Sequence, residues 1–118
     1  MLKGALIIES LSTGVGFDDS QLMLRRLARF ETTDTTPTQP AIWTILEFSS
    51  QMNPDALAEL LSGALTSPSW YANFDTEEQA FVVFPGKVFQ YPHGDQRRRD
   101  EVAAYARSVG VPDSQLDW

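Results

Sequence analysis

Most of the chain consists of short apolar runs separated by turn-forming residues. The runs are rich in β-branched and aromatic side chains, which is typical of strands. They are residues 4–11, 41–50, 70–74, 80–84 and 87–91. Residues 21–31 fit both helical spacing and simple alternation, and we interpret them as a strand. The pattern predicts five to six strands.

Two other segments carry apolar residues at three- and four-residue intervals and predict helices. Before the first, Asn53 can cap the helix and Pro54 suits its first position. Before the second, Asp95 is the capping residue. Gly110, followed by Val111, predicts a left-handed glycine end to the second helix.

These elements follow one another in the order βββαβββα. We therefore predict a single α+β domain over residues 1–118, with an antiparallel sheet and both helices packed on one face. The strands around Ile45 and Val83 are apolar on both sides, so the second face needs a cover. A homodimer packed sheet against sheet would provide it, and curling of the sheet within one chain is the alternative.

The composition excludes several classes of function but does not identify one. The 118-residue chain has 16 acidic and nine basic side chains and a formal charge of -7, which opposes binding to nucleic acid or an anionic membrane. It has no cysteine, which excludes disulfides, thiolate nucleophiles and cysteine-based metal sites. No apolar stretch is long enough to span a membrane, and we expect a cytoplasmic protein.

Candidate chemistry is sparse. His93 is the only histidine, so a histidine-rich metal site is excluded, and an exposed loop histidine is the alternative to a catalytic base. The acidic pairs are adjacent in sequence, which directs their side chains apart on regular structure. We assign no catalytic residue, metal ligand or cofactor.

A ligand or partner would have to use the aromatic residues of the second half and the loop before the second helix. The basic run Arg97 to Arg99 could contact an anion or nucleic acid, but neighbouring acids favour a solvated, salt-bridged helix face. The candidate binding residues are Trp70, Tyr71, Tyr91, His93 and Arg97.

The second half of the chain carries a distinctive series of short motifs. They are Trp70-Tyr71, Phe81-Val82-Val83-Phe84, Phe89-Gln90-Tyr91-Pro92-His93-Gly94-Asp95, Gly110-Val111-Pro112 and Gln115-Leu116-Asp117-Trp118. Over residues 70–118 the chain resembles a family of small uncharacterised bacterial proteins with the pattern FVVFxGxxFxYPxGD and GVPxxQLDW. The resemblance implies a shared fold and no known activity.

The leading hypothesis is a non-enzymatic, soluble domain that acts through protein contacts as a homodimer. The alternative is a small-molecule-binding protein or enzyme with a pocket near His93 and Tyr91. A third hypothesis, nucleic-acid recognition through Arg97 to Arg99, is disfavoured by the acidic net charge.

Overall fold

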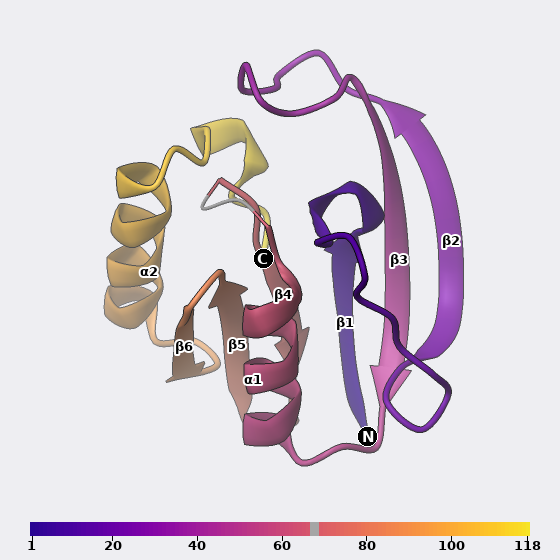
Figure 1. The fold of residues 1–118 in the computed structure, drawn as a ribbon. Coiled ribbons are helices and arrows are strands. Elements are labelled where there is room, and N and C mark those ends of the chain that lie inside the picture. Colours follow the sequence, from indigo (N-terminus) through magenta and orange to yellow (C-terminus); the bar gives the residue numbers. More distant parts are fainter. Residues whose placement is uncertain (67–68) are drawn as a thin grey trace.

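The computed structural model describes residues 1–66 and 69–118, and its centre is one six-stranded antiparallel sheet with the order β2-β3-β1-β4-β5-β6 (Figure 1). The strands are β1 (Leu2–Ile7), β2 (Met23–Glu31), β3 (Ile42–Ser50), β4 (Ala72–Asp75), β5 (Gln79–Phe84) and β6 (Lys87–Pro92). The helices are α1 (Pro54–Ala64) and α2 (Gln96–Ser108), with 3₁₀ turns at Ile8–Ser10 and Asp113–Gln115. The α+β class and the order βββαβββα are confirmed, as is a strand within residues 21–31.

The helix ends follow their sequence signals. The Asn53 side chain accepts the first-turn bonds of α1, and the Asp95 carboxylate accepts a 3.1 Å bond from the amide of Arg98 in α2. Gly110 has a φ of 95°, and the amide of Val111 after it donates to the Ala106 carbonyl at 3.0 Å. The predicted caps and the glycine end are therefore confirmed.

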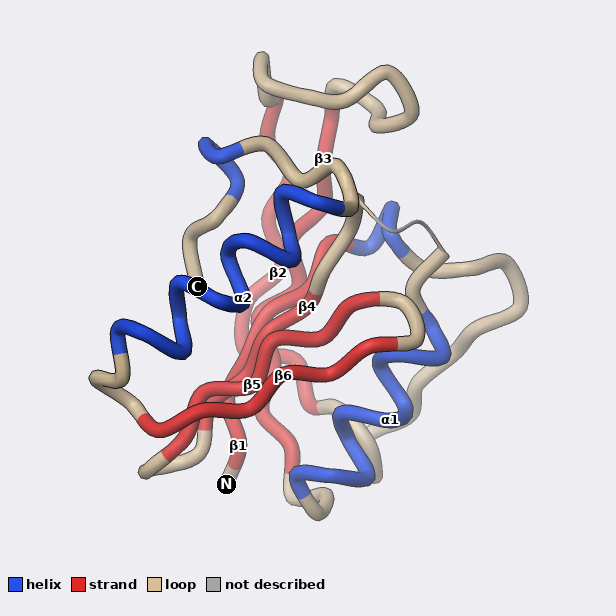
Figure 2. Tube along the Cα trace, turned by 90° about the vertical axis from the view of Figure 1, so that its left-hand side faces the viewer, coloured by secondary structure: helices blue, strands red, loops and turns tan. Residues whose placement is uncertain are grey.

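The placement of both helices on one face of the sheet is wrong. In β5, Phe81 and Val83 pack in the same cluster as Leu61 of α1. The alternating residues of β5 belong instead to a second cluster, which contains Val102 of α2 and Tyr91. Figure 2 shows the two helices on opposite sides of the strands.

Because the helices lie on opposite faces, both faces of the sheet are covered around β5. β5 is apolar on both sides because it is sandwiched by the chain's own helices, so Val83 requires no partner molecule. The strands β2 and β3 lie at the other side of the sheet (Figure 1). Any remaining unpartnered apolar surface therefore has to be sought on β2 and β3.

Candidate functional site

The structure divides the five candidate binding residues among three places. Trp70 and Tyr71 line one cleft, whereas Tyr91 and His93 line a separate cavity. Arg97 lines neither, and its side chain is 86% exposed with Nε 3.7 Å from Glu101. The predicted residues therefore do not form one site.

The basic run at the start of α2 is largely engaged by its neighbours. Besides Arg97, Arg98 also contacts Glu101, with Nη1 2.7 Å from the carboxylate. Arg99 turns toward the end of the chain, where its Nη2 lies 3.3 Å from the Trp118 carbonyl oxygen. The predicted salt-bridged helix face is confirmed for Arg97 and Arg98.

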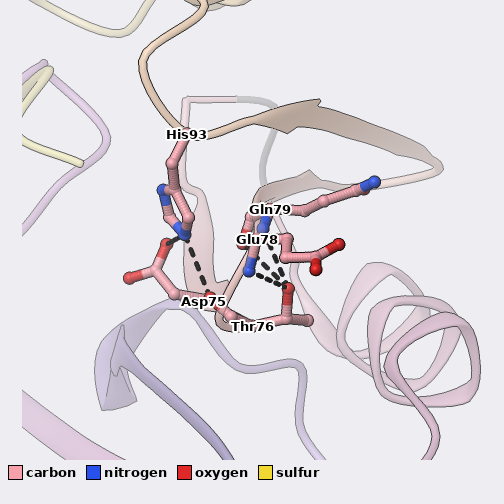
Figure 3. A network of polar contacts seen from close by, with 5 residues as sticks. All are labelled: Asp75, Thr76, Glu78, Gln79 and His93. Atoms are coloured by element: carbon pink, nitrogen blue, oxygen red, sulfur yellow. Dashed lines mark hydrogen bonds and ion pairs between the residues drawn. The ribbon is translucent and has the colours of Figure 1, made fainter.

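His93 belongs to a cavity of about 290 Å³ between β4, β6 and the start of α2. Figure 3 shows its imidazole directed at the turn after β4, where Nε2 lies 3.0 Å from the Thr76 carbonyl oxygen. A carbonyl oxygen can only accept, so Nε2 carries the proton of this bond. The Asp75 carboxylate is 3.9 Å from the same nitrogen, too far for a hydrogen bond.

Two ionisable side chains of this cavity have raised pKa values. Burial raises the pKa of the Asp75 carboxyl, and the nearby His93 partly offsets the effect. Burial also raises the pKa of Tyr91, which keeps its phenol protonated at neutral pH. With its Nε2–H donated to the Thr76 carbonyl, His93 keeps Nδ1 as the only ring nitrogen that can accept a proton.

The second site is an aromatic cleft of about 360 Å³ between the β2-β3 ribbon, β4 and the last residues of the chain. The Trp43 and Trp70 rings have centroids 5.0 Å apart, and Phe30 contacts Trp43 edge-on at 6.1 Å. Trp43 Nε1 donates to the Pro40 carbonyl at 2.8 Å, which fixes the orientation of its ring. These contacts make a preformed aromatic wall.

Polar contacts tie the loop after β2 to the end of the chain and close one side of this cleft. Gln115 Nε2 donates to the Asp34 carbonyl at 2.7 Å, and the Ser114 hydroxyl donates to the Asp34 carboxylate. Gln39 is buried and contacts Gln115 at 3.0 Å. The loop at residues 32–40 therefore supplies part of the cleft.

Tyr71 joins the cleft to the end of the chain. Its single hydroxyl proton is directed between two acceptors, the Gln115 carbonyl and the Asp117 carboxylate. Burial, and secondarily the hydrogen bond to the Asp117 carboxylate, raise the pKa of the Tyr71 phenol. The phenol therefore stays protonated and holds residues 115–117 against β4.

Removal of this hydroxyl should loosen the end of the chain. We expect Tyr71→Phe to lower the free energy of unfolding by about 2 kcal/mol, because a bond to a charged acceptor is lost. Urea denaturation measures the change. The matched control is Tyr105→Phe, whose hydroxyl has no hydrogen bond to the residues that the structure describes. An equal loss of stability in the two variants would show that the Tyr71 hydroxyl does not hold the end of the chain.

The third feature is the exposed edge strand β2. Four large apolar side chains are exposed there, with Leu24 66% and Leu27 57% accessible, together with Met23 and Phe30. Two of its arginines are held by β3, because Arg26 Nη1 lies 2.8 Å from Glu47 and Arg29 Nε lies 3.2 Å from the Thr44 hydroxyl. Sequence reasoning identified the strand but not its exposure on both faces.

No protein-family model matches this chain, and no curated protein or solved structure is significantly similar to it. The resemblance of residues 70–118 to small bacterial proteins therefore stays a prediction. Within residues 1–66 and 69–118, no helix has the length and apolar character needed to cross a membrane.

Proposed function

We propose that the protein is a non-enzymatic protein-contact domain that forms a homodimer by pairing β2 with β2 of a second copy. The observation that carries the proposal is a nine-residue edge strand with four exposed large apolar side chains. Long, apolar edge strands are templates for pairing with another chain. A cytoplasmic location is part of the proposal, supported by the absence of cysteine from the sequence.

The backbone of β2 offers free hydrogen-bonding groups at regular intervals. The Thr32 amide donates to the Ala41 carbonyl at 2.8 Å, which makes this a hydrogen-bonded pair of the ladder. Such pairs alternate along antiparallel strands, so Ala28 and Phe30 also direct their backbone groups toward β3. Leu27, Arg29 and Glu31 then direct theirs outward, toward a partner.

Charge distinguishes two registers near the middle of β2. A two-fold axis through Ala28 places Leu27 opposite the partner's Arg29 and Arg25 opposite the partner's Glu31. The first pair is a hydrogen-bonded position, and the second joins opposite charges at the β-bulge that lies between Leu24 and Arg26. An axis through Leu27 would instead place Arg25 opposite the partner's Arg29, where like charges repel. The proposed dimer is centred on Ala28.

Light scattering over a concentration series tests this interface. We expect the unmodified protein to be a dimer and Leu27→Lys to weaken the dimer about tenfold or more, because the new cation faces the partner's Arg29. The control, Val88→Lys, places the same charge on the opposite edge strand β6, where Val88 is 38% exposed, and should remain dimeric. A monomeric unmodified protein would exclude the proposal, and loss of the dimer only in Val88→Lys would place the interface on β6.

A further inference from the structure

We propose that the aromatic cleft binds a small organic ammonium ion. This inference is independent of the proposed dimer and concerns the opposite side of β2 from Leu27, where the ring of Phe30 meets Trp43. Three kinds of group in the cleft support it: aromatic rings, carboxylates and one amide without a partner.

The aromatic rings come from three different parts of the fold. Phe30 lies on β2 and Trp43 on β3, while Trp70 and Tyr71 immediately precede β4. The two tryptophans are buried and contact each other, and the Trp43 indole is hydrogen-bonded, so the aromatic wall is held in one arrangement. Rings of this kind attract cations through their negative faces.

The charges that line the cleft have one sign. The lining residues include the carboxylates of Asp34 and Asp117 and no lysine, arginine or histidine. Each carboxylate accepts a bond from a neutral hydroxyl, of Ser114 or Tyr71, and keeps further lone pairs. Neither forms an ion pair with the residues described in the structure. An aromatic cleft lined by two carboxylates that form no ion pair with the described residues complements an organic cation.

The side-chain amide of Asn73 indicates that the ligand also carries a polar group. Asn73 of β4 lines both this cleft and the neighbouring His93 cavity, and its side chain makes no hydrogen bond to the part of the chain that the structure describes. It can bond a hydroxyl or carbonyl group attached to the cation. The volume of about 360 Å³ lies near the lower end for ligand pockets, which favours a small molecule.

Choline and its uncharged isostere 3,3-dimethylbutan-1-ol separate charge recognition from apolar contact. Titrations of the intact protein, followed by tryptophan fluorescence and calorimetry, should show saturable choline binding with an affinity about tenfold or more above that of the isostere. Tetramethylammonium and putrescine extend the probe set to a cation without a polar group and to primary ammonium ions. Equal affinity for choline and its isostere, or no binding of any cation at millimolar concentration, would overturn the proposal.

Variants locate the site. Asp34→Asn and Trp43→Phe should each weaken choline binding about fivefold or more, because they remove a carboxylate charge or reduce the aromatic wall. Asp19→Asn makes the same chemical change at an exposed position outside the cleft and should leave the affinity unchanged. If Asp19→Asn weakens binding as much as Asp34→Asn, binding follows net charge alone and the cleft is not the site. Leu27→Lys should bind choline normally, so failure of the dimer and failure of the ligand site are distinguishable.

Discussion

Gly4→Ala is expected to be the most damaging single methyl group that can be added to this protein. A Cβ at Gly4 would lie 2.2 Å from the carbonyl oxygen of Asn73 and 2.5 Å from the Cβ of Phe74. Gly4 pairs with Phe48 of β3 on one side and with Phe74 of β4 on the other, so it lies in the middle of the sheet. A clash with backbone atoms cannot be relieved by rotating a side chain, and β1 and β4 would have to separate.

We expect a loss of about 3 kcal/mol or more in the free energy of unfolding, which is the upper range for overpacked cores. This is a large part of the 5–15 kcal/mol typical of a domain. Urea denaturation measures it, and Gly63→Ala in α1 is the control, because an added Cβ there meets no atom within 4 Å. Gly63→Ala should raise stability by about 0.5–1 kcal/mol. Equal stability of Gly4→Ala and the unmodified protein would show that β1 and β4 are not paired as described.

The elements themselves could be predicted because their signals are local. Asn53 before Pro54 and Gly110 before Val111 fix helix ends through bonds within a few residues. The strand order could not be predicted in this way, because β1 pairs with β3 and β4 rather than with β2, which follows it in sequence. Apolar alternation states that a strand is buried but not which strands lie beside it.

The predicted position of the helices was wrong for a related reason. An amphipathic stripe such as that of α1 shows that one side of the helix is buried, but it does not show against which face of the sheet. The residues that could have decided the matter were Phe81 and Val82, adjacent in β5 and buried on opposite faces. From the sequence alone, the apolar character of β5 on both sides favours a second chain or a curled sheet, whereas α2 covers the second face.

The sequence predicts some of the residues that line the aromatic cleft and misses others. Trp70 and Tyr71 were selected because aromatic residues concentrate in the second half of the chain, and both line the aromatic cleft. Trp43 and Asp34 were not selected, since they reach the cleft only through the strand order and through contacts with residues 113–117. Contacts between residues so distant in sequence leave no periodicity in the sequence.

Phe84→Ala is the second large expected effect, because this residue connects the two sides of the sheet. Its carbonyl accepts a 3.0 Å bond from the Ser62 hydroxyl of α1. Its fully buried ring lies on the opposite side, with centroids 4.9 Å from Tyr105 of α2, 5.9 Å from Phe89 and 6.0 Å from Tyr71. Truncation leaves a cavity among three aromatic rings, and we expect a loss of about 3–5 kcal/mol in the free energy of unfolding.

Val88→Ala is the control for this experiment, since Val88 lies on the neighbouring strand β6, is 38% exposed and should lose less than about 1 kcal/mol. Phe84→Ala should also expose the end of the chain to proteolysis, because Tyr71 packs on Phe84 and holds residues 115–117 through its hydroxyl. Tyr71→Phe removes only that last link. A loss of stability in Phe84→Ala no greater than that in Val88→Ala would mean that α2 is not packed on β5, and the two-sided sheet would have to be abandoned.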